Sequence, residues 1–347
     1  MSARIAILLP NWIGDAVMAT PTLRALRRGA GPDAHLAGFG RAAICELLAG
    51  GSSLDELSEL SAARAFPLER SLRLAGQLRA GRFDRALLLT NGLGAAWATW
   101  VAGIGERIGY ARRGRGVLLT RALGPPREGG SLRPVPAIDY YLGLASALGY
   151  PPEAGPMELA TMPVDEAAAE RIWEGFGERR GRPAILLNNG AASGTAKLWP
   201  AESMAELARR VTHELDFNVL VLAGPGEREA ALRIVELAAS AGVIAMPAAS
   251  LGATKACIRR AHLVVSTDSG PRHIAAAFGV PLVSLFGPTD PRWTDLHSSL
   301  DLMLHESVPC GPCQRRTCPY DHHRCMRDLS VERVWLAVQA QLARFRP

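Results

Sequence analysis

Two charged side chains follow apolar, strand-like runs of the sequence, one in each half of the chain. Asp15 comes after the run Arg4–Pro10, and Lys197 lies in the loop after Ala184–Asn188. A carboxylate in such a turn can take a proton from a hydroxyl group, and an ammonium group can balance the charge of an anion. Asp15 equally fits a helix cap, because Asp is favoured at that position, so both interpretations stay open.

The loop that contains Lys197 is rich in small residues. It runs from Asn189 to Pro200, and Ser193 and Thr195 add hydroxyl groups to it. Small residues let backbone N–H groups approach an anion, and a lysine supplies a point charge. The loop lacks the spacing of a nucleoside-triphosphate P-loop and also lacks G-x-G-x-x-G. It is either an anion-binding loop or a plain surface loop.

A third turn, TDSGPRH from Thr267 to His273, follows the apolar run Leu263–Ser266. Hydroxyl groups and a glycine at a strand-to-helix turn, with a proline early in the helix, favour an anion site built from backbone N–H groups and the helix dipole. His273 lies about one turn into that helix, within reach of a phosphate. The alternatives are a structural histidine and, for Asp268, a helix cap.

Glu227 ends a fourth turn of this kind, GPGE at residues 224–227, which follows the strand-like run Asn218–Ala223. Acidic residues beside nucleotide-binding sheets accept hydrogen bonds from ribose hydroxyl groups. An exposed glutamate at the start of a helix fits the same pattern, so this assignment also stays open.

Four cysteines crowd together near the end of the sequence: Cys310, Cys313, Cys318 and Cys325. A closed zinc site needs four thiolates, and the first pair has the C-x2-C spacing of such sites. The later spacings are not those of a common zinc finger, so reduced cysteines that pack in the interior are the other interpretation. The 6 cysteines of the whole chain do not resemble the framework of a disulfide-rich secreted protein.

The composition is that of a large globular protein. The chain has 347 residues, 48% of them hydrophobic and 21% charged, which excludes a small disulfide scaffold and a disordered chain. Lys and Arg exceed Asp and Glu by 39 to 33, which favours an anionic ligand without requiring nucleic acid. Since the N-terminus lacks a signal-peptide pattern, we expect a cytoplasmic protein. The uncharged stretch Ala86–Gly105 contains Asn91 and several glycines, which favours a strand, a turn and a helix over a membrane span.

The four turns need a scaffold that brings them together, and the rest of the sequence predicts one. Strand-like runs alternate with helix-like segments from end to end, which indicates parallel α/β layers. Strands are expected at Arg4–Pro10, His35–Phe39, Arg85–Thr90, Arg107–Tyr110, Ala184–Asn188, Asn218–Ala223, Leu263–Ser266 and Pro281–Phe286. Helices are expected at Ala16–Arg28, Leu68–Arg79, Ala95–Gly103, Ile138–Leu148, Ala167–Phe176, Ala201–His213, Glu227–Ala239, Leu251–Ala261, Pro271–Phe278 and Val331–Arg344.

A proline-rich stretch without periodicity, Gly149–Pro163, predicts a linker between two doubly wound domains. We expect an N-terminal domain over residues 1–155, a C-terminal domain over 163–330 and a terminal helix over 331–347. Ligands of doubly wound sheets bind beyond the carboxyl ends of the strands, which is where all four turns lie.

Taken together, these motifs resemble glycosyltransferase family 9, the ADP-heptose:lipopolysaccharide heptosyltransferases, and the heptosyltransferase II branch most. The resemblance covers nearly the whole chain and rests on the order and spacing of the motifs. They are NWIGDAVM from Asn11, RIGY from Arg107, KLWP from Lys197, TDSG from Thr267 with His273, LFGPT from Leu285, and the late cysteines.

This resemblance implies the GT-B architecture, two Rossmann-like domains that face a central cleft, with the acceptor bound mainly by the first and the sugar nucleotide mainly by the second. It implies an inverting transfer of a heptose or related sugar from an ADP-sugar to a lipopolysaccharide core acceptor, without a metal or other cofactor. Asp15 would be the general base, and Lys197 would neutralise the departing diphosphate. The substrate-binding residues that it implies are Asn11, Gly14, Ser193, Thr195, Glu227, Thr267, Asp268, Ser269, Gly270 and His273. Arg272 departs from the family pattern, which commonly has an apolar residue there, and could add a phosphate contact or meet a different sugar.

The implied partners are an ADP-sugar donor and a lipid-linked oligosaccharide acceptor, with peripheral contact at the inner face of the inner membrane and no nucleic acid. Arg112, Arg113 and Arg115 are the expected contacts with anionic headgroups. Two other interpretations stay open: a GT-B nucleotide-sugar epimerase, and a nucleic-acid-binding protein that uses the arginines near the cysteines.

Overall fold

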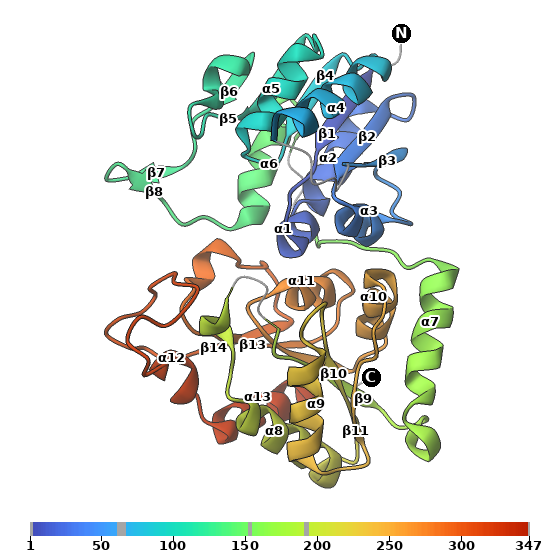
Figure 1. Ribbon diagram of the computed structural model, residues 1–347, viewed down its shortest axis with the longest axis vertical. Helices are drawn as coiled ribbons and strands as arrows, with labels where there is room; N and C mark the ends of the chain where they lie inside the picture. The colour runs from blue at the N-terminus through green and yellow to red at the C-terminus, as the bar shows by residue number, and fades with distance from the viewer. Residues whose placement is uncertain (1–2, 61–66, 152–154, 191–193, 346–347) are drawn as a thin grey trace. The chain divides into compact units, whose positions relative to one another are not determined.

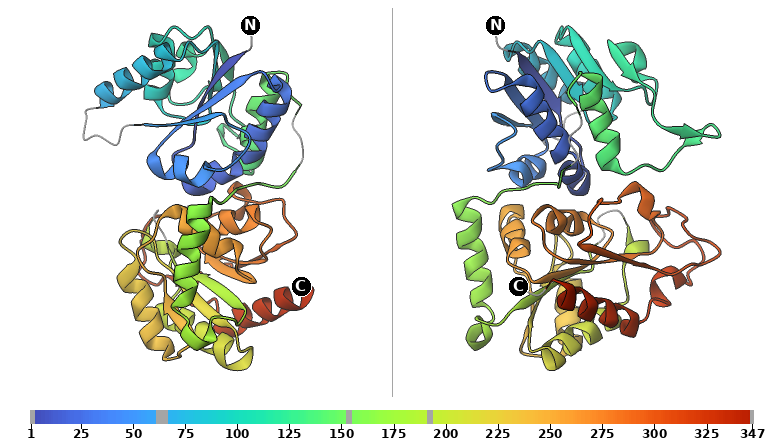
Figure 2. Two further views of the ribbon diagram at one scale, coloured as in Figure 1. Left: turned by 90° about the vertical axis from the view of Figure 1, so that its right-hand side faces the viewer. Right: turned by 180° about the vertical axis from the view of Figure 1, so that it is seen from behind.

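The computed structural model describes residues 3–60, 67–151, 155–190 and 194–345. The chain divides into two compact units (Figure 1, Figure 2). The first comprises Met1–Ala160 and Arg292–Thr294, and the second comprises Thr161–Pro291 and Asp295–Pro347. Each unit is built on its own parallel sheet, as the alternation of strands and helices predicted.

The first unit contains a six-stranded sheet in the order β3-β2-β1-β4-β5-β6. This is the order of a dinucleotide-binding fold, in which the strand order reverses between the first and the fourth strand. The parallel register pairs Ile5 with Leu36 on one side and with Arg85 on the other. The strands are β1 (Arg4–Leu8), β2 (His35–Gly40), β3 (Glu56–Glu59), β4 (Arg85–Leu88), β5 (Glu106–Tyr110) and β6 (Arg121–Leu123), and a separate hairpin consists of β7 (Arg127–Glu128) and β8 (Ser131–Leu132).

Helices cover both faces of this sheet because its central strands are apolar on both sides. These helices are α1 (Ile13–Met18), α2 (Thr20–Ala30), α3 (Ala42–Leu48), α4 (Pro67–Ala80), α5 (Leu93–Val101) and α6 (Ala137–Ala147). On one face, side chains of α4 and α5 pack with Leu8, Phe39 and Leu88 of the strands. The helices α2 and α6 pack against each other on the other face.

The helix expected at Ala16–Arg28 is two helices, which corrects the sequence prediction. α1 ends at Met18, and α2 begins at Thr20 with Pro21 in its first turn. Pro21 has no N–H to donate, and its ring would clash with the carbonyl of Val17 in a continuous helix. The Thr20 hydroxyl donates to that carbonyl instead, at 2.7 Å.

The second unit repeats the topology of the first in the order β11-β10-β9-β12-β13-β14. Its strands are β9 (Ala184–Asn188), β10 (Asn218–Leu222), β11 (Val243–Ala245), β12 (Leu263–Thr267), β13 (Leu282–Phe286) and β14 (Asp301–His305). Its helices are α7 (Pro163–Glu174), α8 (Ala201–Glu214), α9 (Arg228–Ala238), α10 (Leu251–Arg259), α11 (Gly270–Ala277), α12 (Arg324–Arg327) and α13 (Val331–Arg344). Asn188, at the end of β9, is in register with Leu222 of β10 and Ser266 of β12.

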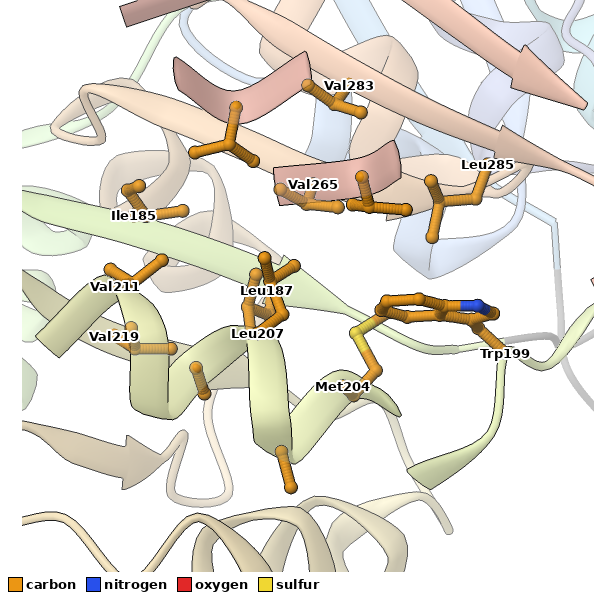
Figure 3. Close-up of a cluster of buried hydrophobic side chains, with 14 of the residues drawn as sticks. Ile185, Leu187, Trp199, Met204, Leu207, Val211, Val219, Val265, Val283 and Leu285 are labelled. Atoms are coloured by element: carbon orange, nitrogen blue, oxygen red, sulfur yellow. The ribbon is translucent and has the colours of Figure 1, made fainter. Parts of the chain in front are cut away.

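The core of the second unit lies between its sheet and the helices α8, α9 and α13 (Figure 3). Trp199 and Met204 fill it near the ends of the strands, and the Trp199 indole donates to the carbonyl of Leu329 at 2.9 Å. Trp335 of α13 is also buried there, so the terminal helix is part of this unit. The other face of the sheet is covered by α7, α10 and α11.

The uncharged stretch Ala86–Gly105 forms the strand β4, a turn and the helix α5, as the sequence predicted. Within the described residues, no helix has both the length and the apolar character needed to cross a membrane.

Candidate active site

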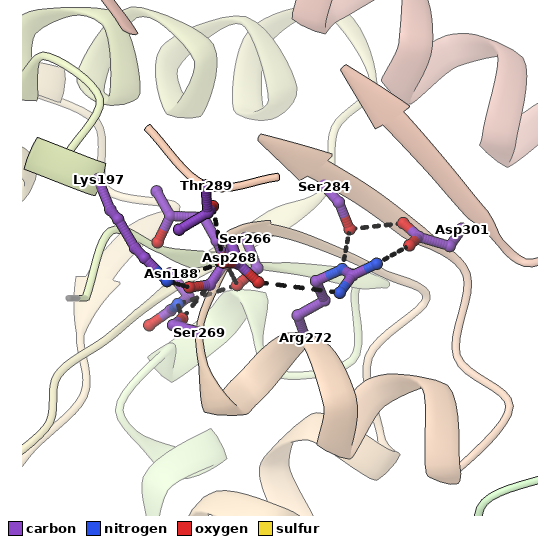
Figure 4. Close-up of polar contacts among 10 residues, drawn as sticks. Asn188, Lys197, Ser266, Asp268, Ser269, Arg272, Ser284, Thr289 and Asp301 are labelled. Atoms are coloured by element: carbon purple, nitrogen blue, oxygen red, sulfur yellow. Dashed lines mark hydrogen bonds and ion pairs between the residues drawn. The ribbon is translucent and has the colours of Figure 1, made fainter. Parts of the chain in front are cut away.

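The site predicted in the second half of the chain lies at the carboxyl ends of β9, β10 and β12, which are neighbours in the sheet. Asn188 connects the turns that follow two of these strands. Its amide donates to the hydroxyl groups of Ser266 and Ser269, at 2.9 and 2.7 Å (Figure 4). The Thr267 hydroxyl donates to the Gly190 carbonyl at 2.8 Å. The turn before α11 is therefore fixed to the turn after β9.

The N-terminus of α11 lies directly after the turn that contains Thr267 and Asp268. Ser269 is its extended N-cap residue, Gly270 is its first residue, and no side-chain hydrogen bond caps it within the described residues. Its first backbone N–H groups therefore have no capping side chain, and together with the helix dipole they attract an anion.

The half-buried Lys197 and the buried Asp268 form an ion pair (Figure 4). The Lys197 ammonium donates to Asp268 Oδ2 at 2.7 Å and to the Asp268 carbonyl at 2.8 Å, and the Thr289 hydroxyl donates to the same Oδ2 at 2.8 Å. Burial raises the pKa of Asp268, but the charge and hydrogen bond of Lys197 and the charge of Arg272 outweigh it and lower the pKa to about 2. Asp268 is thus a carboxylate that holds Lys197, rather than the helix cap considered above.

His273 lies beneath the same turn, and its side chain is buried. Burial and the charge of Arg272 lower the pKa of His273 to about 3, so the ring is neutral near pH 7. Its Nδ1 is buried without a hydrogen-bond partner among the described groups. A buried polar atom without a partner is costly, so this nitrogen is available to form a hydrogen bond with a bound group.

Several contacts hold the Lys197 loop, defined here as residues 194–200. The Asn189 side chain closes the loop by accepting from Trp199 N at 2.9 Å and donating to Trp199 O at 2.8 Å. Arg316 accepts from Ala196 N at 3.0 Å. Gly194 has a φ of 136°, and a Cβ there would overlap the backbone carbonyl of Arg316. Lys197 is therefore presented by a braced turn and not by a plain surface loop.

The Cys-rich segment supplies part of this brace. His323 Nε2 lies 2.6 Å from the Ala196 carbonyl. The four cysteines are free thiols, and burial followed by the charges of the three other thiols raises the pKa of Cys325 to about 11. In the part of the chain that the structure describes, no group of three or more His, Cys, Asp or Glu side chains is arranged to hold a metal. A zinc site at the four cysteines stays a prediction from the sequence.

The helix predicted to begin at Glu227 begins at Arg228, and Glu227 is the N-cap residue of this helix, α9. Its Oε2 accepts from Gly224 N at 2.9 Å. A Cβ at Gly190 or at Gly224 would lie 2.8 Å from the same oxygen. The carboxylate thus packs between the turns after β9 and β10 and is not an exposed helix-start residue.

Thr195 is exposed at the start of the short 3₁₀ helix that contains Lys197. Ser193, the other hydroxyl predicted in this loop, lies outside the described residues.

In the first unit, Asp15 is the third residue of α1, and the N-cap position is Trp12. Asp15 therefore lies in the first turn of the helix and is not its N-cap. Burial and the charge of Asp15 raise the pKa of Tyr141 well above its usual value, so this buried phenol is neutral. Gly14 precedes Asp15 in α1, and the exposed Asn11 donates to the Thr90 hydroxyl at 3.2 Å.

A buried arginine that the sequence analysis assigned to the surface lies beside these residues. Arg115 is fully buried and donates to Asn91 Oδ1 at 3.2 Å, to the carbonyl of Tyr110 at 2.9 Å and to the carbonyl of Thr90. This corrects the expectation that Arg115 meets headgroups, whereas Arg113 is exposed. The Tyr140 hydroxyl also donates to Asn91 Oδ1, at 3.2 Å. These contacts join the ends of β4 and β5.

Arg272, expected to contact a phosphate or a sugar, is instead fully buried beneath the turn. It donates to the Ser284 hydroxyl at 2.8 Å and to Asp301 Oδ2 at 2.6 Å. The sequence analysis missed Asn188, Ser284 and Asp301. For Asn188 a signal existed, because it is a polar residue that ends an apolar strand.

The first unit also contains a pocket away from the predicted site residues. It is lined by Thr20, Leu48, Ser53, Glu158 and their neighbours, and Ser53 donates to Glu158 Oε1 at 3.3 Å. None of the predicted site residues lines it, so the pocket and the predicted chemistry are separate features.

Comparisons with known proteins agree with these observations. The model of glycosyltransferase family 9 (heptosyltransferase) matches residues 71–324. Lipopolysaccharide heptosyltransferase 2 of Escherichia coli K12 is 26% identical over 353 residues, which cover 98% of each chain. Lipooligosaccharide heptosyltransferase 2 of Campylobacter jejuni is 31% identical over 163 residues, so the match spans 45% of this chain and about half (50%) of that protein's length. The structure of Escherichia coli ADP-heptose LPS heptosyltransferase II has the same fold, with a TM-score of 0.80 and 24% identity over 98% of this chain and 99% of that one.

Proposed function

Because the chain belongs to glycosyltransferase family 9, we propose that it transfers a heptose from ADP-heptose to a lipopolysaccharide core acceptor. Relatives are named for this class of reaction. The observation that carries the proposal is the Lys197–Asp268 pair, which lies beside the N-terminus of α11 and the unpartnered Nδ1 of His273. A cation, a helix N-terminus without a capping side chain and a neutral imidazole together suit a diphosphate.

The donor would bind to the second unit. Its diphosphate would lie on the turn before α11, with the implied ligands Thr267, Asp268, Ser269, Gly270 and His273 around it. Asp268 would act through Lys197 because a carboxylate repels phosphate. Glu227 would accept hydrogen bonds from the ribose, since its carboxylate already lies at the carboxyl ends of β9 and β10.

Asp15 would act on the acceptor as the general base. The acceptor hydroxyl oxygen forms a bond to the anomeric carbon while the bond from that carbon to the diphosphate oxygen breaks. The hydroxyl proton passes to the Asp15 carboxylate, and ADP leaves with the electron pair of the broken bond. Attack opposite the leaving group inverts the anomeric centre. Lys197 and the dipole of α11 take up the developing negative charge, which gives the reaction an electrostatic route that needs no metal.

A transfer assay tests the proposal. Purified protein is given ADP-, UDP- and GDP-sugars, each with and without a deacylated lipopolysaccharide core acceptor. We expect product only from ADP-heptose with the acceptor present, and NMR of the product should show inversion. Conversion of a nucleotide sugar without acceptor would instead support the epimerase, and retention at the anomeric carbon would contradict the mechanism.

The same assay tests metal independence. We expect full activity in excess chelator, because the charges described above replace a metal. Activity that returns only on addition of Mg²⁺ or Mn²⁺ would overturn this part of the proposal. Elemental analysis of the purified protein separately tests the zinc alternative at the four cysteines.

We also propose peripheral contact with anionic membranes through Arg112 and Arg113. Arg115 is left out of this proposal because its side chain is buried. Each such charge contributes about 1 kcal/mol near a membrane surface and is screened by salt. Co-sedimentation with anionic vesicles should therefore be weak and lost at about 1 M salt. Equal binding to neutral vesicles would contradict the electrostatic account.

A further inference from the structure

A second buried ion pair lies directly beneath the pair that holds Lys197. Arg272, one turn after Asp268, is fully buried. Its Nη2 lies 2.6 Å from Asp301 Oδ2, its Nε donates to the Ser284 hydroxyl at 2.8 Å, and its guanidinium stacks on the Phe286 ring with 4.8 Å to the centroid. All these partners belong to the strands β13 and β14, which fix the arginine in place.

The two pairs meet at Asp268 (Figure 4). Lys197 contacts Asp268 Oδ2, whereas Arg272 Nη1 lies 3.9 Å from Oδ1. Four charges thus alternate in a row: the cation of Lys197, the carboxylate of Asp268, the cation of Arg272 and the carboxylate of Asp301. Lys197 is the member of this row nearest to solvent, with 17% of its side chain exposed.

We propose that Arg272 and Asp301 are positioning residues that make Lys197 available to the leaving diphosphate. When Lys197 turns to the diphosphate, Asp268 loses its main partner while it remains buried. A buried carboxylate without a partner is costly. Arg272 provides a second counter-charge beside Asp268, and Asp301 holds Arg272 in place, so that Lys197 is not trapped on Asp268. This inference rests on the proposed function, because it assigns Lys197 to the diphosphate.

The Arg272–Asp301 pair also stabilises the fold, so the experiment must separate this structural role from the positioning of Lys197. The variant Arg272→Met alone would leave Asp301 buried with the Ser284 hydroxyl but without a counter-charge, and it is expected to unfold readily. The double variant Arg272→Met/Asp301→Leu removes both charges and keeps apolar volume, and such replacements usually leave stability near that of the original protein. Thermal unfolding checks this, and Arg260→Met is the matched control in the same unit, because Arg260 pairs with Glu166 on another face.

A double-mutant cycle with Lys197→Met tests the proposal. In the presence of Lys197, the Met/Leu pair should lower kcat for transfer about tenfold and change KM for ADP-heptose less. In the Lys197→Met background, the same pair should lower kcat by less than about twofold, because the group through which it acts is gone. Equal losses in both backgrounds, or full activity of the folded double variant, would overturn the inference. If the unaltered protein transfers no heptose, it is instead the proposed function that fails.

Discussion

The two units share one strand order but bury their arginines in different ways. In the first unit, Arg115 is held by the neutral oxygen atoms of Thr90, Asn91 and Tyr110. In the second, Arg272 is paired with the carboxylate of Asp301. Burial lowers the pKa of Arg115 to about 10. The two buried arginines therefore differ in their partners, because neutral oxygen atoms hold Arg115 between β4 and β5, whereas a carboxylate of β14 holds Arg272.

The largest expected effect separates the general-base chemistry proposed for the first unit from the donor binding proposed for the second. Asp15→Asn should lower kcat roughly 10²–10⁴-fold, because a general base contributes that much, and should leave ADP affinity near its original value. Lys197→Met is the counterpart and should weaken ADP binding as well as kcat. Turnover and calorimetric titration with ADP measure both. An Asp15→Asn variant that keeps more than about a tenth of kcat would not fit a general base.

The second effect is the loss of stability when Arg115, which neutral oxygen atoms hold, is removed. Arg115→Met removes one hydrogen-bond donor from the carbonyls of Thr90 and Tyr110 and from Asn91 Oδ1, and we expect a loss of about 3 kcal/mol in the free energy of unfolding. The paired charges of the second unit can be removed together at much lower cost. Urea unfolding of the two variants compares them. A loss below about 1 kcal/mol for Arg115→Met would remove the distinction between the two arginines.

A smaller effect is expected where the Lys197 loop meets Arg316. Gly194→Ala places a Cβ against the Arg316 carbonyl and should displace Lys197, with a loss of roughly 10- to 100-fold in kcat. Gly31→Ala in the first unit is the matched control, because Gly31 also has a positive φ, of 84°, but nothing lies within 4 Å of its added Cβ. Similar kcat values for both variants would show that the contact does not position Lys197.

The last prediction concerns acid stability. The pKa of His273 is about 3 in the folded protein, against 6.5 for an ordinary histidine, so between these values the unfolded chain binds a proton that the folded chain does not. Stability is therefore lost as the pH falls from about 6.5 towards 3, by up to about 1.4 kcal/mol per pH unit. Denaturation at pH 7, 6 and 5 should show a shallower slope for His273→Gln. The exposed His213→Gln should keep the original slope, and equal slopes for all three proteins would contradict burial of a neutral ring.

The central strands of both sheets were predictable because they are continuous apolar runs. β1, β4, β9, β10, β12 and β13 all lie where the sequence placed a strand. The outer strands were missed because they are short or polar, as in β3, which reads ELSE, and β14, which reads DLMLH. A strand at the border of a sheet buries fewer side chains, so its sequence carries a weaker signal.

The turns of the site were predictable for the same reason, since they end apolar strands. Their connections were not. Asp301 is distant from Arg272 in the sequence, and only the pairing of β13 with β14 brings it to the arginine. Arg115 likewise looked like one more surface cation in an arginine-rich segment. Whether a charged side chain is buried depends on partners that are distant in the sequence, so a local sequence pattern does not predict it.

The carboxylate of Glu227 has a consequence for how the family can vary. It occupies the space that a side chain at either Gly190 or Gly224 would need. A side chain at either glycine would have to displace this carboxylate, whose Oε2 also accepts from Gly224 N. We therefore expect the identity of residue 227 to limit which residues fit at positions 190 and 224, and a shorter side chain at 227 to relieve both positions at once.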